Sequence, residues 1–217
     1  MVKAVLFDLD GTLANTLEDL ANTGNTVVSA LGVQPYETEA YKLFVGHGIP
    51  NLIERIVPKE MHTKELLDNC FVNFMDYYRA HYLDKTAVYE GMPMLVSELR
   101  KMGIKMAVVS NKIQEMTERI VQKLYGDSFD LVLGKRQELP AKPDPAMLFY
   151  ACRELGVEPE SCAFVGDSGM DMAAANAASM QAVGVLWGFR SREELENNGS
   201  QYLARDAQEL LNCLTNI

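Results

Sequence analysis

Five short apolar runs recur along the chain with almost no polar residue alternating inside them. They are KAVLF (3–7), IKMAVVS (104–110), FDLVLG (129–134), CAFVGDS (162–168) and QAVGVLW (181–187). An apolar run of this length without alternation indicates a strand that is buried on both faces, as strands are in a parallel sheet. The pattern therefore predicts about five strands of one sheet with layers on both sides.

Segments with a helical period separate these runs. They are MPMLVSELRKMG (92–103), KIQEMTERIVQKLYG (112–126) and DPAMLFYACRELG (144–156), and the first has a proline near its start and a glycine at its end. Because strand and helix alternate, we predict an α/β fold with a doubly wound, Rossmann-like parallel sheet.

One interval, residues 15–85, breaks the alternation. It has helical patterning over 17–32, 41–57 and 64–83 and no convincing strand. We therefore predict an inserted helical subdomain at 15–85 and a catalytic core made of 1–14 and 86–217. Because the insert begins just after the first strand, we expect it over the end of the sheet where that strand finishes.

Hydrophobic content and net charge limit the kinds of protein and partner that the sequence is compatible with. Of the 217 residues 48% are hydrophobic, which is enough for a substantial core, and 30 acidic against 20 basic residues give a net charge of −10. This charge argues against a nucleic-acid or anionic membrane partner. With no long apolar segment, no signal-like start and four scattered cysteines without a CxxC pair, we expect a cytoplasmic protein with reduced thiols.

Polar side chains collect where the predicted strands end, and one lysine precedes a helix at the same edge. These residues are Asp8, Asp10, Ser110, Asn111, Lys142, Asp167 and Asp171. Ligands of an open parallel sheet bind beyond the carboxyl ends of its strands. Four carboxylates in one crevice need a compensating cation, and oxygen ligands without His or Cys favour Mg²⁺.

The segment DLDGTL (8–13) places two carboxylates one residue apart where a strand unwinds into a turn. Such a pair can share a cavity and act differently. Asp8 is suited to attack phosphorus and form an aspartyl-phosphate, while Asp10 could protonate the leaving oxygen and later deprotonate a water. The metal, Lys142, Ser110 and backbone N–H groups would stabilise the charge on the phosphoryl oxygens.

Four segments in order, DLDGTL (8–13), VVSN (108–111), KPDP (142–145) and GDSGMD (166–171), resemble the signatures of the haloacid dehalogenase superfamily. The resemblance implies the following assignments. They are Asp8 as nucleophile, Asp10 as acid and base, Ser110 and Lys142 as phosphate ligands, and Asp8, Asp167 and the Asp10 backbone carbonyl as Mg²⁺ ligands. Asn111 and Thr12 join the phosphate ligands by position, and Thr12 is also expected to steady Asp10. Asp171 would act on the metal through water or orient Lys142.

The helical insert resembles the cap of this superfamily. SNK (110–112), GHGI (46–49) and residues 187–210 look like the phosphoglycolate phosphatase branch. The resemblance implies a phosphatase for a small phosphorylated metabolite. A sugar-phosphate mutase, a pyrophosphatase and a catalytically silent binding protein remain alternatives, and the substrate and the oligomeric state stay open.

Other interpretations exist for several of these residues. An EF-hand calcium loop would need acids where Leu6 and Leu17 stand, which excludes that interpretation for DLDGTL. Asp167 and Asp171 could also serve a helix start, where aspartate is favoured. In the insert, His47 could face the substrate or be an ordinary surface residue, and Arg55 could bind a substrate carboxylate or face solvent.

Overall fold

The computed structural model describes residues 2–217 and divides into two compact units. One unit consists of Met1–Asn15 and Val88–Ile217, and we call it the core unit. The other, Thr16–Ala87, is called the helical unit. Among the described residues, no helix is long and apolar enough to cross a membrane.

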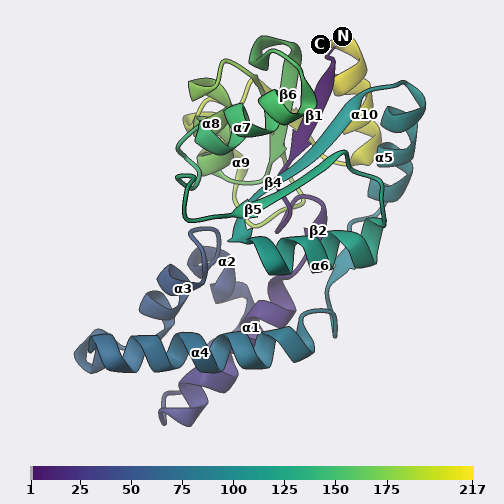
Figure 1. The fold of residues 1–217 in the computed structure, drawn as a ribbon. Coiled ribbons are helices and arrows are strands. Elements are labelled where there is room, and N and C mark those ends of the chain that lie inside the picture. The colour runs from purple at the N-terminus through teal and green to yellow at the C-terminus, as the bar shows by residue number, and fades with distance from the viewer. Residues whose placement is uncertain (1) are drawn as a thin grey trace. The chain divides into compact units, whose positions relative to one another are not determined.

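The core unit is built on a parallel sheet of six strands in the order β5-β4-β1-β6-β7-β8 (Figure 1). The strands are β1 (Ala4–Phe7), β4 (Lys105–Ile113), β5 (Leu131–Lys135), β6 (Cys162–Gly166), β7 (Gln181–Val185) and β8 (Tyr202–Ala204). From β1 the chain adds β4 and β5 on one side and later β6, β7 and β8 on the other. The predicted doubly wound α/β fold is confirmed.

Helices cover both faces of this sheet (Figure 1). On one face lie α7 (Ala146–Leu155), α8 (Gly169–Ala177) and α9 (Arg192–Asn197), and on the other lie α5 (Met92–Lys101), α6 (Gln114–Tyr125) and α10 (Ala207–Asn216). Within β1, Ala4 and Leu6 pack in the cluster that includes α7 and α8, while Phe7 makes an edge-to-face contact with Phe129 on the opposite face. Burial on both faces explains why the strand sequences lack alternation.

The structure corrects the predicted end of β4. We predicted a strand that ends at Ser110, but β4 continues to Ile113 with an irregularity in its pairing to β5 between Val109 and Ile113. Ser110, Asn111 and Lys112 therefore lie within the strand, and the following helix begins at Gln114 rather than at 112. Three short strands were not predicted, because two or three residues carry no periodic signal. They are β8 and the separate pair β2 (Ala14–Asn15) and β3 (Ala87–Val88).

The helical unit contains α1 (Leu17–Ala30), α2 (Tyr41–Phe44), α3 (Ile49–Ile56) and α4 (Lys64–His81), with short 3-10 turns at Thr38–Ala40 and Lys59–Met61. The helix predicted at 41–57 is two helices, since Gly46 and Gly48 have positive φ values of 110° and 88° and break it. The fully buried rings of Tyr41, Phe74 and Tyr78 help to form the unit's apolar interior.

Asp19 ties the end of the helical unit to its first helix. The residue is 2% exposed, and its carboxylate accepts hydrogen bonds from the backbone N–H groups of Lys85 and Thr86 at 2.8–3.1 Å. A buried carboxylate that accepts several backbone donors has its charge well satisfied. The returning chain is thus held against α1.

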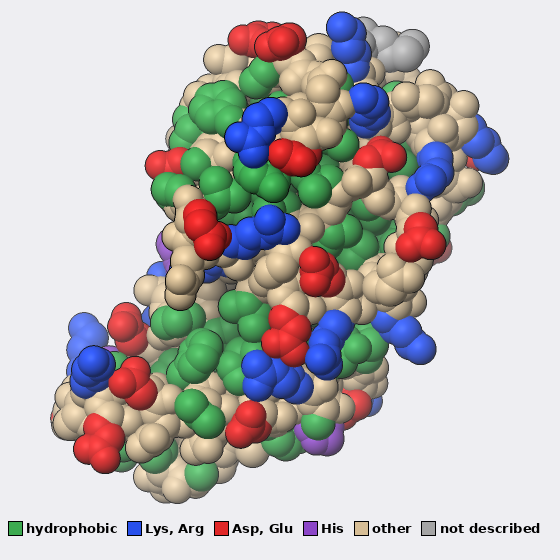
Figure 2. Space-filling model, in the orientation of Figure 1, with side chains coloured by type: hydrophobic (Ala, Val, Ile, Leu, Met, Phe, Trp, Pro, Cys, Tyr) green, Lys and Arg blue, Asp and Glu red, His purple; other side chains and the backbone are tan. Residues whose placement is uncertain are grey.

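The surface carries charges of both signs. On the face shown in Figure 2, acidic and basic side chains are interspersed, although the chain as a whole has a net charge of −10. The excess of negative charge is therefore not gathered into one patch on this face.

Candidate active site

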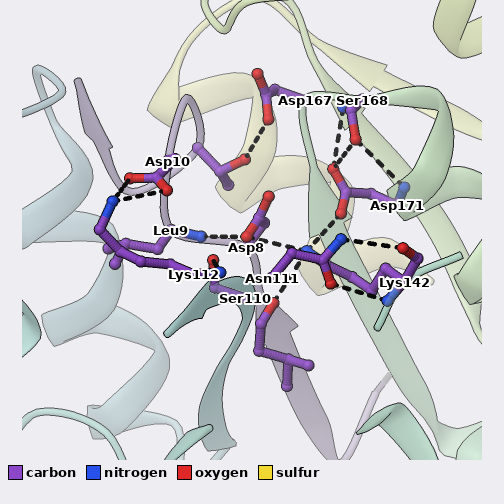
Figure 3. Close-up of polar contacts among 12 residues, drawn as sticks. Asp8, Leu9, Asp10, Ser110, Asn111, Lys112, Lys142, Asp167, Ser168 and Asp171 are labelled. Carbon is purple, nitrogen blue, oxygen red and sulfur yellow. Dashed lines mark hydrogen bonds and ion pairs between the residues drawn. The ribbon is translucent and has the colours of Figure 1, made fainter. Parts of the chain in front are cut away.

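Three buried carboxylates meet at the carboxyl edge of the sheet (Figure 3). Asp8 follows β1 and Asp167 follows β6, and these two strands are parallel neighbours with Phe7 opposite Val165. Asp171 lies in the first turn of α8. Carboxylate oxygens of Asp8, Asp167 and Asp171 all lie within 4.8 Å of one another, so the structure brings together three of the four predicted acids.

Lys142 places its ammonium group among these carboxylates. Its Nζ lies 2.9 Å from Asp8 Oδ1 and 2.7 Å from Asp171 Oδ1, and it donates to the Val109 carbonyl oxygen at 3.1 Å. The Asn111 side chain holds the Lys142 backbone, because its Nδ2 donates to the Lys142 oxygen at 3.0 Å and its Oδ1 accepts from the Lys142 nitrogen at 2.8 Å. The end of β4 thus fixes a lysine that arrives from the segment before α7.

Burial and crowding perturb the ionisation of the site. Desolvation raises the pKa of Asp8 to about 6, with further raising by Asp171 and Asp10 and an opposing effect of Lys142. Burial, followed by the charges of Asp171 and Asp8, also holds the pKa of Asp167 well above its ordinary value. Burial alone would lower the pKa of Lys142, but Asp171 and Asp8 outweigh it and raise that pKa. The cluster therefore favours the arrival of further positive charge.

The carboxylate of Asp167 is closely packed on several sides. Phe189 N–H donates to its Oδ2 at 2.7 Å, and the Thr12 hydroxyl donates to its Oδ1 at 3.4 Å. A Cβ on Gly11, whose φ is 83°, would lie 2.2 Å from Asp167 Oδ2, and one on Gly188 would lie 2.2 Å from Asp167 Cβ. Side chains at either glycine would collide with this carboxylate. Thr12, predicted as a phosphate ligand that also steadies Asp10, thus contacts Asp167.

Asp171 combines two of the roles considered from the sequence. Its Oδ2 accepts from the Ser168 N–H at 3.0 Å and its own N–H donates to Ser168 Oγ at 3.4 Å, which together make a capping box at the start of α8. The Ser168 hydroxyl also donates to Oδ2 at 2.6 Å. Asp171 Oδ1 contacts Lys142, so the second carboxylate oxygen is committed to the lysine. This contact fits the predicted role of Asp171 in orienting Lys142, and its predicted action on a metal through water stays a prediction.

Asp10 contacts Lys112, a residue with no role predicted from the sequence. Lys112 Nζ lies 2.9 Å from Asp10 Oδ1 and 3.0 Å from Oδ2, and the lysine side chain is only 2% exposed (Figure 3). The backbone N–H of Lys112 donates to Ser110 Oγ at 3.3 Å. A strand prediction that continued past Ser110 would have placed the side chains of Ser110 and Lys112 on one face of the strand, but it would not have shown the contact with Asp10.

A family model described as "Haloacid dehalogenase-like hydrolase" matches residues 5–185 of the chain. The chain belongs to this haloacid dehalogenase-like hydrolase family. The resemblance stated from four short segments is thereby confirmed.

Curated relatives within the haloacid dehalogenase-like hydrolases carry the name phosphoglycolate phosphatase. The protein of that name from Chromobacterium violaceum is 33% identical over 99% of this chain and 97% of its own length. The one from Neisseria meningitidis is 34% identical over 87% of this chain and 82% of its own length.

Solved structures share the fold over nearly the whole chain. A protein from Lactobacillus delbrueckii subsp. bulgaricus, provisionally described as a phosphoglycolate phosphatase, has a TM-score of 0.93 and 30% identity over 99% of both chains. CbbY from Rhodobacter sphaeroides, solved in complex with phosphate, has a TM-score of 0.83 and 26% identity over 97% of this chain and 96% of its own.

The family and the acidic cluster together indicate metal use. The cluster fits a hard cation, because its donors are carboxylate oxygens and because burial and mutual repulsion raise the pKa values of Asp8 and Asp167.

Two residues of the helical unit were predicted to contact substrate. They are His47, between α2 and α3, and Arg55, on α3, and both are exposed. Arg55 Nη1 donates to the Leu43 carbonyl oxygen. Contact of His47 and Arg55 with substrate stays a prediction.

Proposed function

We propose that this protein is a Mg²⁺-dependent phosphatase that hydrolyses a small phosphomonoester of the phosphoglycolate type through an aspartyl-phosphate on Asp8. The observation that carries the proposal is the placement of Asp8 2.9 Å from the buried ammonium of Lys142 and within the three-carboxylate cluster. A nucleophile, a cation for the phosphoryl oxygens and a set of metal-ligand oxygens thus occupy one sheet edge. The names of the curated relatives support the choice of phosphomonoester.

In this proposal Asp8, Asp167 and the backbone carbonyl of Asp10 hold the metal, and Asp171 orients Lys142. When bound, Mg²⁺ supplies positive charge that neutralises the carboxylates and the phosphoryl oxygens. Two hydrogen bonds keep the Asp167 carboxylate directed at the site, because Phe189 N–H donates to one oxygen and the Thr12 hydroxyl donates to the other.

Phosphoryl transfer to Asp8 is the first half of the reaction. An Asp8 carboxylate oxygen bonds to phosphorus while the bond from phosphorus to the ester oxygen breaks. Asp10 gives its proton to the departing oxygen, so that an alcohol leaves. Lys142, Ser110, Asn111 and Thr12 are the proposed ligands of the phosphoryl oxygens.

Hydrolysis of the aspartyl-phosphate is the second half. Asp10, now ionised, takes a proton from a water whose oxygen bonds to phosphorus. The bond between phosphorus and the Asp8 oxygen breaks, which releases inorganic phosphate and restores both carboxyl groups. One residue that first donates and then accepts a proton therefore serves both halves.

The remaining part of the proposal concerns selectivity. We assign the cap role to the inserted helical segment, residues 15–85, with His47 and Arg55 as its candidate contacts to the leaving group. An arginine can bind a carboxylate with two parallel hydrogen bonds, which suits a substrate that carries a carboxylate beside its phosphate.

The test is hydrolysis of p-nitrophenyl phosphate, 2-phosphoglycolate, pyrophosphate, a nucleoside monophosphate and a hexose phosphate with Mg²⁺ and with EDTA. We expect Mg²⁺-dependent release of phosphate, with 2-phosphoglycolate preferred, and loss of activity in Asp8→Asn without loss of fold. Absence of turnover on every substrate would support the catalytically silent alternative. Isomerisation of a hexose phosphate without phosphate release, or preference for pyrophosphate, would replace the phosphatase proposal by the other two alternatives.

A further inference from the structure

Asp10, the acid and base of the reaction proposed above, contacts Lys112, to which that reaction gives no role. Both carboxylate oxygens of Asp10 lie within 3.0 Å of Lys112 Nζ, and the Asp10 side chain keeps 20% of its surface exposed whereas the lysine keeps 2%. Burying an ammonium group is costly unless it is paired. Such a lysine has a structural or functional reason for its place.

Two hydrogen bonds hold the backbone of Lys112 at the end of β4. Its backbone N–H donates to Ser110 Oγ at 3.3 Å, and its carbonyl oxygen accepts from the Thr117 hydroxyl of α6 at 3.2 Å. The backbone is therefore held on both sides of the residue. Its side chain can act as a fixed point against which a partly exposed carboxylate is located.

The two catalytic aspartates have separate cations. Lys142 contacts Asp8 and Asp171, while Lys112 contacts Asp10 (Figure 3). This separation holds the Asp10 carboxylate to one side of Asp8, although only Leu9 lies between them in the chain. A general acid has to stand beside the leaving oxygen and away from the attacking atom.

We propose that Lys112 is a positioning residue, which holds the Asp10 carboxyl group on the leaving-group side of Asp8. The ammonium group donates a hydrogen bond to a carboxyl oxygen while Asp10 carries its proton, and it forms an ion pair with Asp10 once that proton has left. This inference rests on the proposed phosphatase function. Lys112 itself touches neither phosphorus nor the breaking bond. Without the ammonium group of Lys112, the Asp10 carboxyl group loses both of these contacts, and we expect proton delivery to the leaving oxygen to become less frequent.

The step that Lys112 supports can be isolated by the choice of leaving group. When the ester bond breaks, its electron pair goes to the leaving oxygen, and an alkoxide needs the proton of Asp10 whereas dinitrophenolate departs without one. The quantity kcat/KM reports steps up to the first irreversible one, the transfer to Asp8. A defect in proton delivery therefore lowers kcat/KM for alkyl phosphates selectively.

The experiment compares wild type with Lys112→Met on 2-phosphoglycolate, ethyl phosphate and 2,4-dinitrophenyl phosphate at one Mg²⁺ concentration. We expect kcat/KM to fall by about 10- to 100-fold on both alkyl esters and by less than about threefold on the aryl ester. Lys112→Arg, which keeps the charge, recovers most of the alkyl activity. In an Asp10→Asn background, Lys112→Met produces no further loss on ethyl phosphate.

Three results would overturn the inference. Equal losses on all three substrates would mean a general structural role, and unchanged kinetics would mean no role. A loss confined to 2-phosphoglycolate would make Lys112 a ligand of the substrate carboxylate. Lys101→Met, at an exposed lysine of α5, is the matched control, and Lys112→Gln replaces the methionine variant should that one fail to fold. Inactivity of the wild type on all three esters would instead refute the proposed function.

Discussion

Replacing Asp8 by asparagine should stabilise the metal-free protein at neutral pH while it destroys the nucleophile. Burial raises the pKa of Asp8 from 3.8 to about 6, so ionising this group costs the folded state free energy. The difference of about two pKa units corresponds to about 3 kcal/mol in the free energy of unfolding. The side chain is 13% exposed, and solvent screening therefore reduces this figure little.

The stability that Asp8→Asn gains over the wild type is expected to depend on pH. Below about pH 4, Asp8 is protonated in both the folded and the unfolded chain, and it has no effect on stability. Between about pH 4 and 6 the unfolded chain releases its proton first, so the wild type loses stability as the pH rises. Asparagine does not titrate. The advantage of Asp8→Asn should thus be absent near pH 4 and complete above about pH 6.

The assay is urea unfolding in EDTA across this pH range. Trp187 is the single tryptophan and lies in the core unit, where its Nε1 donates to the Thr12 carbonyl oxygen, so its fluorescence follows unfolding of the unit that carries the site. Asp127→Asn, at an exposed aspartate of the same unit, is the matched control and should show no such pH-dependent gain. An Asp8→Asn variant that is less stable than wild type at pH 7, or equally more stable at every pH, would refute the reasoning.

Three further predictions follow from other contacts. Gly188→Ala should weaken Mg²⁺ binding by about 10- to 100-fold, because the alanine Cβ would collide with Asp167. Titration calorimetry measures the Mg²⁺ affinity, and an affinity equal to that of the wild type would contradict the prediction. Asp19→Ala should destabilise the helical unit by about 2–4 kcal/mol, since the N–H groups of residues 85–86 lose their acceptor, and a urea midpoint equal to wild type by circular dichroism would exclude this. Cys213 should be the one thiol of the folded chain that reacts rapidly with Ellman's reagent, as the other three are buried, and rapid reaction of several thiols would disprove the prediction.

The features that the sequence made predictable are those with long or repeated signals. The central strand β1 and its neighbour β6 are continuous apolar runs, and their ends locate Asp8 and Asp167 at a common edge before any coordinates are known. Four short segments in the expected order likewise identified the family. These signals arise from burial on both faces of the sheet, which leaves little freedom in residue type.

Other features depend on contacts between distant residues. The extension of β4 to Ile113 places polar side chains inside a strand, where a hydrophobic pattern predicts none. Lys112 is unremarkable until Asp10 is brought beside it from 102 positions away in the chain. Thr12 similarly has its acceptor on Asp167, which lies 155 positions away. Spacing within the sequence contains no information on such pairs.

The end of β4 gives the two cationic side chains a common mechanical support. Asn111 clamps the backbone of Lys142, and the next residue, Lys112, carries the second ammonium group itself. A displacement of this strand end would therefore move both positive charges together. Insertion of a single residue between Asn111 and Lys112 would uncouple the two. The length of β4 between Asn111 and Lys112 therefore sets how the two cations are placed relative to each other.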